Sequence, residues 1–222
     1  MIPLCDSLPS RTAPVVTILI IAINVAIFLH EWTMDPFTRN HFVAQYALIP
    51  RRFQAIDLFT SMFLHGGWLH LIGNMWFLWI YGDNVEDILG RFKYLLFYIG
   101  CGVAAALVHL FFNIDSRIPT VGASGAIDGV MGAYLLKFPH ARIVTLIPIF
   151  IFFTTVEIPA WIMLAYWFII QLFSGVGEIT RAGVNEGGIA WFAHVGGFVA
   201  GMVLVKLLGA KQPYRRYSEY RW

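Results

Sequence analysis

Long apolar segments recur along the chain and are separated by short stretches that contain glycine, proline and charged residues. The hydrocarbon core of a bilayer is about 30 Å thick, so a helix that crosses it needs roughly 20 mostly apolar residues. By this criterion we predict membrane-spanning helices at about 15–30, 58–81, 94–112, 122–138, 159–173 and 190–208. The pattern therefore predicts an all-α membrane protein, built as a six-transmembrane-helix bundle.

Two segments between these spans have a mixed pattern. The connection 31–57 places aromatic residues such as Trp32 and Phe37 among charges. This mixture is typical of the headgroup region and predicts an interfacial outer loop between the first two spans, although an ordinary structured loop explains it equally well. The apolar segment 143–155 is broken by Pro148, and we expect a loop or a short strand at the membrane interface there.

The composition agrees with a membrane protein. Of the 222 residues 59% are hydrophobic and only 13% are charged, which is too few charges to cover a soluble globule. We expect a single domain over residues 1–222, with a helical core at about 15–208 and short cytoplasmic tails. Cys5 and Cys101 lie far apart and match neither a disulfide framework nor a metal site, so we expect no metal and no cofactor.

The balance of charge predicts the orientation in the membrane. If the chain begins on the inner side, most of its 15 basic residues lie in inner segments, as the positive-inside rule requires. Both termini are then cytoplasmic. No targeting extension precedes the first span, which favours the cytoplasmic membrane of a prokaryote.

Four polar side chains fall near the outer ends of three predicted spans. His70 and Asn74 lie on the second span, Ser124 on the fourth and His194 on the sixth. These spans run in the same direction, so their beginnings share one depth in the membrane. A lone membrane serine usually packs helices together, and a lone histidine is usually a hydrogen-bonded core residue. Their common depth is harder to explain by packing, because polar groups inside a membrane are costly and usually face a cavity.

These side chains have the chemistry of acyl transfer. The imidazole of His194 can take the proton of the Ser124 hydroxyl and so make it a nucleophile. The resulting oxyanion needs donors already in place, and the side chains of Asn74 and His70 supply N–H groups. The backbone N–H of Ser124 is a third candidate, because the first N–H groups of a helix lack partners within it.

Glycine spacing predicts which spans pack together. Gly125 and Gly129 lie four residues apart on the fourth span, and Gly197 and Gly201 do so on the sixth. Faces of small residues at this spacing let two helices approach closely. The fourth span continues for only about 21 Å after Ser124, less than the bilayer core, so we expect the serine to lie below the outer surface in a wet recess.

The motifs around these residues resemble those of the rhomboid family of intramembrane serine proteases. The matching stretches are HGGWLHLIGNMWFLWIYGDNVEDILG (65–90), GASG (122–125) and AHVGGFVAG (193–201), in that order along the chain. The likeness extends over roughly 15–208. Each motif alone is weak, and the three together in order are specific.

The resemblance implies a rhomboid bundle of six helices and a catalytic dyad of Ser124 and His194 without a third member. It also implies an oxyanion site formed by His70, Asn74 and the Ser124 amide, and cleavage of transmembrane helices near the outer membrane face. The expected partners are single-pass membrane protein substrates and the lipid bilayer, with no nucleic acid. Helix five of the family is thought to move or to sit beside the substrate entry.

Asp128 departs from the family pattern, in which an aromatic residue often occupies this place and supports the histidine ring. An aspartate four residues after Ser124 shares its helix face. It can accept a hydrogen bond from His194 as a partial triad, it can be protonated, or it can pair elsewhere in the bundle. A second departure is the lack of the Trp-Arg pair that is common in the first outer loop of the family.

Two other classes of function compete with an intramembrane serine endopeptidase. A non-catalytic rhomboid-like protein would bind membrane helices without cutting them, but such proteins typically lack the serine or the histidine. A channel or transporter would be expected to have inverted repeats around a midplane site, and we find no duplicated segment. The chain also lacks the H-E-x-x-H motif of zinc proteases.

Overall fold

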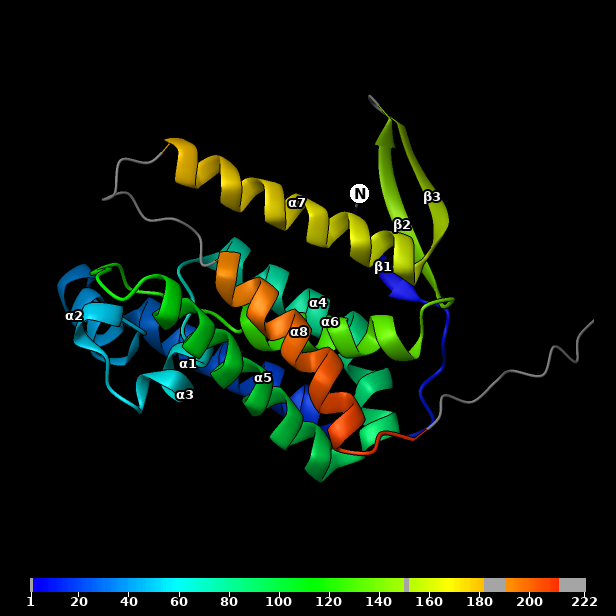
Figure 1. The fold of residues 1–222 in the computed structure, drawn as a ribbon, viewed down its shortest axis with the longest axis horizontal. Coiled ribbons are helices and arrows are strands. Elements are labelled where there is room, and N and C mark those ends of the chain that lie inside the picture. Colours follow the sequence, from blue (N-terminus) through cyan, green and yellow to red (C-terminus); the bar gives the residue numbers. More distant parts are fainter. Residues whose placement is uncertain (1, 150–151, 182–190, 212–222) are drawn as a thin grey trace, which may run out of the picture.

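The computed structural model describes residues 2–149, 152–181 and 191–211. Helices dominate it, and a small sheet stands at one end of the helical bundle (Figure 1). In chain order the elements are β1 (Ile2–Asp6), α1 (Val15–Thr33), α2 (Pro36–Tyr46), the 3-10 turn η1 (Pro50–Arg52), α3 (Asp57–Thr60), the 3-10 turn η2 (Ser61–Phe63), α4 (Trp68–Leu89), α5 (Arg91–Phe112), α6 (Ser124–Lys137), β2 (Arg142–Ile149), β3 (Phe152–Pro159), α7 (Ala160–Arg181) and α8 (Trp191–Leu207).

Each predicted span coincides with a helix, namely α1, α4, α5, α6, α7 and α8. The second differs most in its bounds, because α4 begins at Trp68 instead of Leu58 and continues to Leu89. The residues before the two glycines fold separately as α3 and η2. Ala190, the predicted start of the sixth span, lies outside the described residues. So do Arg215, Arg216 and Arg221, which contribute to the predicted orientation.

Two of these helices meet the length and hydropathy expected of a membrane span. Among the described residues, α1 and α5 are long and apolar enough, by length and composition, to cross a bilayer. Helix α4 ends in a turn that carries Asp83, Glu86 and Asp87, and α6 has only 14 residues. The count of six transmembrane helices therefore stays a prediction.

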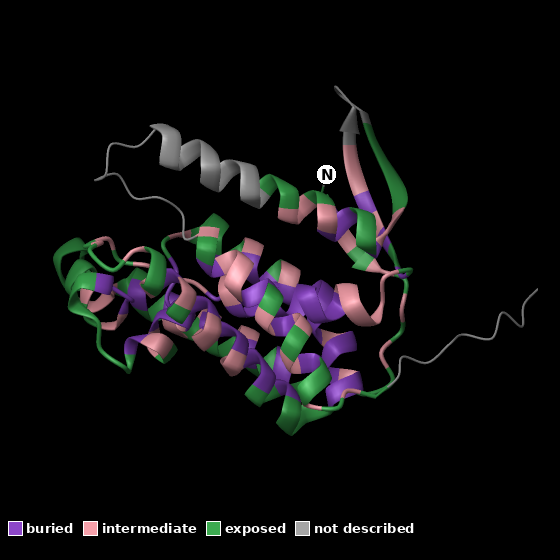
Figure 2. Ribbon diagram, viewed as in Figure 1, coloured by how far each residue is buried: buried purple, intermediate pink, exposed green. Residues whose placement is uncertain are grey.

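Helix α6 lies at the centre of the bundle. An unbroken run from Ala126 to Tyr134 is buried, and the helix packs against α4, α5 and α8. Figure 2 shows buried residues concentrated along these helices. Helix α7 instead runs along the edge of the bundle, as Figure 1 shows. The site carried by α6 is thus held from several sides.

The bundle also carries a three-stranded antiparallel sheet in the order β1-β2-β3. The protein is therefore mostly helical, as predicted, but not all-α, and the expected short strand at 143–155 is part of this sheet. Ile143 pairs with Ile158 between β2 and β3, and Ile2 pairs with Leu146 between β1 and β2. The apolar segment around Pro148 is thus a strand hairpin, and the predicted N-terminal tail supplies an edge strand. β-Branched and aromatic residues, which favour strands, make up most of β2 and β3.

Helix α1 is fixed at its start by a side chain of α4. The carboxylate of Glu86 accepts hydrogen bonds from the backbone N–H groups of Val16 and Thr17, at 3.0 and 2.8 Å. It also accepts one from the Thr17 hydroxyl at 2.8 Å. These N–H groups have no partner within the helix and carry the positive end of its dipole. The buried carboxylate therefore joins α4 to α1.

The connection between α1 and α4 reaches back to the start of α6. Leu48 and Thr120 form an isolated antiparallel bridge, with N–O distances of 3.0 and 2.9 Å. The backbone N–H of Gly122 donates to the carbonyl of Ser61 at 2.9 Å. These bonds position the loop that leads into α6 and so the residue with which α6 begins, Ser124.

Candidate active site

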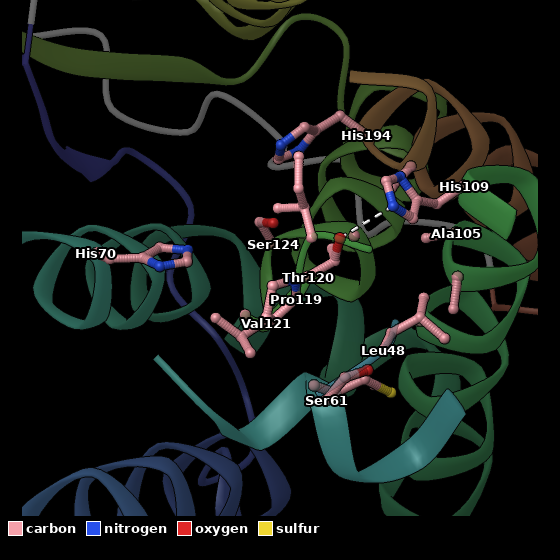
Figure 3. Close-up of a pocket in the computed structure, with 17 residues that line it drawn as sticks. Leu48, Ser61, His70, Ala105, His109, Pro119, Thr120, Val121, Ser124 and His194 are labelled. Carbon is pink, nitrogen blue, oxygen red and sulfur yellow. Dashed lines mark hydrogen bonds between the residues drawn. The ribbon is translucent and has the colours of Figure 1, made fainter. Parts of the chain in front are cut away.

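A cavity of about 250 Å³ opens where α4, α5, α6 and α8 meet. Ser124 and Gly125 at the start of α6 line it, together with His70 of α4, His109 of α5 and His194 of α8. In Figure 3 the ring of His70 faces the loop before Ser124 from one side, and the ring of His194 lies near the serine on another. Three of the four residues singled out from the sequence therefore meet in one cavity.

Glycines let α6 and α8 approach until their backbones touch. A Cβ atom added to Gly197 would overlap the carbonyl group of Gly125, and one added to Gly201 would overlap that of Gly129. The predicted small-residue contact between these helices is confirmed. It is the reason that Ser124 and His194, 70 positions apart in the sequence numbering, reach the same cavity.

The fourth predicted residue, Asn74, lies near the same loop. A Cβ atom on Gly122 would be 2.7 Å from Nε2 of His70 and 3.6 Å from Nδ2 of Asn74. Both side-chain nitrogens thus approach the backbone just before Ser124. Gly122 has a φ of +126°, a backbone conformation that favours glycine. Any larger residue would displace His70.

The amide nitrogen of Asn74 is poised to donate a hydrogen bond. The residue is buried, and its Nδ2 atom has no hydrogen-bond partner among the described residues. A buried donor without a partner costs free energy. Among the same residues, both ring nitrogens of His65 lack a hydrogen-bond partner as well, so it is the position of Asn74 beside Gly122 that makes its amide a candidate donor to a substrate.

His194 makes its hydrogen bond to Asp128. Its Nδ1 atom lies 2.5 Å from Oδ2 of Asp128. Asp128 as a whole residue is 1% exposed. Two tryptophan rings flank the imidazole, with centroid distances of 6.0 Å for Trp191 and 6.2 Å for Trp167 of α7. Among the described contacts the direct hydrogen bond of His194 goes to Asp128 and not to Ser124. Of the alternatives for Asp128, pairing with His194 is the one that the structure adopts.

The cavity contains a further histidine that sequence reasoning did not assign. Nε2 of His109 lies 2.9 Å from the hydroxyl of Thr120, as the dashed line in Figure 3 marks. Its Nδ1 lies 3.4 Å from Nδ2 of Asn113. The only signal in the sequence was a polar residue inside the apolar run of α5. Within the described part of the chain, no group of three or more His, Cys, Asp or Glu side chains is arranged to hold a metal ion.

Comparison with known proteins agrees with this geometry. The family model of the rhomboid domain matches residues 52–211, from the connection before α4 to the end of α8. The chain belongs to the rhomboid family. The match covers every helix that contributes to the cavity.

Curated rhomboid proteins show the same relationship. The chain is 27% identical over 213 residues to rhomboid protein 1, mitochondrial, of Saccharomyces cerevisiae, covering 91% of this chain and 57% of that protein. It is 27% identical over 209 residues to RHOMBOID-like protein 6, mitochondrial, of Arabidopsis thaliana, covering 89% and 61%. It is 31% identical over 139 residues to presenilin-associated rhomboid-like protein A, mitochondrial, of Danio rerio, covering 60% and 35%. The chain thus spans about a third to three fifths of the length of these relatives.

These relatives contradict the predicted location. We expected the cytoplasmic membrane of a prokaryote with both termini cytoplasmic, whereas each of these relatives is a mitochondrial protein of a eukaryote. The predicted prokaryotic location is therefore overturned. The prediction rested on the lack of a recognisable targeting extension. Span lengths and charge balance could not correct it, because they report how a chain sits in a bilayer and not which membrane it occupies.

Proposed function

We propose that this rhomboid protein is an intramembrane serine endopeptidase that cleaves transmembrane helices. The observation that supports it most is the meeting of Ser124 and His194, from separate helices, at one cavity that His70 also lines. Helix packing does not require a hydroxyl and two imidazoles to line the same cavity. Acyl transfer does require them, as nucleophile, general base and oxyanion donor.

The proposed reaction follows from these groups. The Ser124 oxygen attacks the carbonyl carbon of the substrate as its proton passes to His194, and His194 then gives that proton to the leaving amine. Nδ2 of Asn74, a ring N–H of His70 and the backbone N–H of Ser124 donate to the oxyanion. Water, activated by the same imidazole, hydrolyses the acyl-enzyme and regenerates the serine. Such hydrogen bonds often tighten only when substrate binds, which agrees with the absence of a described Ser124–His194 bond.

The membrane restricts the substrate. A peptide bond within a helix is shielded by its own backbone hydrogen bonds, and these must open before the serine can attack. We therefore expect cleavage close to the membrane face at which α4, α6 and α8 begin, at a point where the substrate helix ends or unwinds. Glycine or proline near that point should speed cleavage. The names of the relatives favour a mitochondrial membrane as the setting.

The direct test is cleavage of a tagged single-pass membrane protein by the purified chain in detergent. Ser124→Ala and His194→Ala should each abolish the product, because each removes one partner of the proton transfer. A fluorophosphonate probe should label the parent protein and leave Ser124→Ala unlabelled. Ser7→Ala changes an exposed serine outside the cavity and serves as the matched control, with full labelling expected. Product formation by Ser124→Ala at the parental rate would rule the mechanism out.

The second candidate is a rhomboid-like protein that binds membrane helices without cutting them. The same experiment separates the two. Binding of the substrate, without cleavage and without fluorophosphonate labelling of Ser124 under any tested condition, would favour the non-catalytic function.

A further inference from the structure

Asp128 is a buried acid that the proposed mechanism does not yet use. It lies in the middle of α6 and is 1% exposed. A carboxylate enclosed among apolar side chains is costly unless it is paired. Packing alone does not call for an acid at this position.

The partner of this carboxylate is the proposed general base. Oδ2 of Asp128 lies 2.5 Å from Nδ1 of His194, which is a short hydrogen bond between α6 and α8. An ionised Asp128 can only accept this hydrogen bond, and Nδ1 of His194 then carries the proton. The other ring nitrogen, Nε2, then carries a lone pair. That lone pair is what a general base needs in order to take a proton from a serine.

The helix spacing makes this geometry rigid. Asp128 follows Ser124 by one helical turn, so the nucleophile and the acid share a face of α6. The Gly125–Gly197 and Gly129–Gly201 contacts hold that face against α8, which carries His194. The three groups are therefore fixed relative to one another by a backbone contact that does not depend on flexible side chains.

We propose that Asp128 is a positioning residue that orients His194, so that the site works as a Ser124–His194–Asp128 triad and not as a dyad. The proposal rests on the proposed function and deepens it. During attack the proton of the Ser124 hydroxyl moves to Nε2 of His194, and the imidazolium so formed keeps its Nδ1 proton. Asp128 stays ionised throughout and offsets the new positive charge. The proton on Nε2 then passes to the leaving amine, and Ser124 is left acylated. Water gives a proton to Nε2 as it attacks the acyl group, that proton passes to the Ser124 oxygen as the acid leaves, and the triad is restored.

The kinetic test is Asp128→Asn, which keeps the size of the side chain and removes its charge. In soluble Ser–His–Asp proteases this exchange lowers kcat by about 10⁴-fold, and we expect a fall of at least roughly 10²-fold, with KM nearly unchanged. A change that only loosened the fold would alter KM and the unfolding temperature as well. Asp115→Asn, in the exposed loop before α6, is the matched control and should cleave at the parental rate.

A second measurement does not depend on activity. In ¹⁵N-histidine NMR of the parent protein, His194 should carry its proton on Nδ1, with a far-downfield proton signal that disappears in His194→Gln. The chain has seven histidines, so this difference spectrum gives the assignment. The same signal should be lost or shifted in Asp128→Asn. If that variant does not fold, the spectrum of the parent still decides the matter, because a bare Nδ1 would overturn the proposal.

The outcomes separate the triad from the function on which it rests. If the parent cleaves substrate and folded Asp128→Asn cleaves equally fast, the triad is wrong and the protease stands. If the parent neither cleaves nor reacts with the fluorophosphonate, both fail together. If Asp128→Asn loses kcat with KM and the unfolding temperature retained, and the parent shows the Nδ1 proton, the triad is supported.

Discussion

At the residue scale, the orphan amide of Asn74 offers a specific test of the oxyanion site. Its Nδ2 atom has no partner among the described residues, so replacing the side chain breaks no described hydrogen bond from this atom. Loss of one oxyanion donor typically lowers kcat by about 10²–10³-fold. We expect Asn74→Ala to show that loss with little change in KM, measured by cleavage of a membrane substrate. Asn40→Ala, on the surface of α2, should not affect kcat; equal rates for both variants would remove Asn74 from the site.

We predict that Asp6, which lies outside the proposed catalytic site, makes the free energy of unfolding depend on pH. The carboxylate of this β1 residue accepts hydrogen bonds from the hydroxyl of Tyr134 and from Nδ2 of Asn84. Burial raises the pKa of Asp6 from 3.8 to about 6, an effect that the Tyr134 hydrogen bond opposes. Because the folded pKa is the higher one, the folded state binds this proton more tightly than the unfolded state. Stability from this group is therefore greatest below about pH 4 and is lost as the pH rises through 6.

The size of this effect is modest, since the side chain is partly exposed. We expect the free energy of unfolding to fall by on the order of 1 kcal/mol between pH 4 and 7. Thermal unfolding in detergent at several pH values measures it. Asp6→Asn should remove this component of the pH dependence, and an identical pH profile in the variant would contradict the assignment.

Residue types and spacing were enough to single out Ser124, His194, His70 and Asn74, because the chemistry of each is local and the glycine motifs lie beside them. The sequence showed that Asp128 is an acid within a predicted span. It could not decide among the three alternatives for this side chain, because the choice depends on which face of α8 meets α6. His109 and Thr120 were missed for a related reason. Their hydrogen bond joins α5 to the loop before α6, and no sequence pattern within either segment predicts it.

At the scale of elements, the contact between α6 and α8 should be sensitive to a single methyl group. A Cβ atom on Gly201 would overlap the backbone of Gly129, so Gly201→Ala should push the helices apart and destabilise the protein by about 1–3 kcal/mol. Activity should fall as well, although Gly201 lies two helical turns beyond His194. Unfolding temperature and cleavage rate, measured on the same preparation, give both effects.

Gly73 provides the matched control. It also lies within a membrane-associated helix, but a Cβ atom there would meet nothing within 4 Å. Gly73→Ala should therefore leave stability unchanged or raise it by about 0.5–1 kcal/mol, because alanine favours helix more than glycine does. Equal losses in the two variants would show that the α6–α8 contact has no special role.

Helix positions followed from hydropathy, and most of their ends followed from glycine and proline. The sheet did not. A short apolar run with a proline gives no periodic signal that separates a strand from an interfacial loop. Its pairing is also decided at long range, because Ile2 of β1 finds its partner in Leu146 of β2. The sequence alone therefore predicts an apolar segment at 143–155, but it does not show that β1 pairs with this segment as an edge strand.

At the scale of the whole molecule, the proposed number of membrane crossings can be tested by chemical labelling. If all the predicted spans cross, the exposed Cys5 and the loop after α6 share one side, and the loop before α6 lies on the other. A membrane-impermeant maleimide should therefore label Cys5 and His140→Cys from one face of sealed vesicles, and Arg117→Cys from the opposite face. The last two variants are made with Cys5→Ser; Cys101 is buried. Labelling of Arg117→Cys and His140→Cys from the same face would mean that α6 does not cross.

The order in which the chain is made has a consequence for the sheet. Strand β1 stands at the very beginning of the sequence, but its partner β2 follows α6. The ribosome must therefore add about 140 further residues before the pairing can form, which takes on the order of ten seconds or more at typical synthesis rates. During that interval α1 to α6 are synthesised while β1 has no strand with which to pair. Closure of the sheet is thus a late event in biogenesis, and it requires β1 and β2 to lie on the same side of any membrane that the helices between them cross.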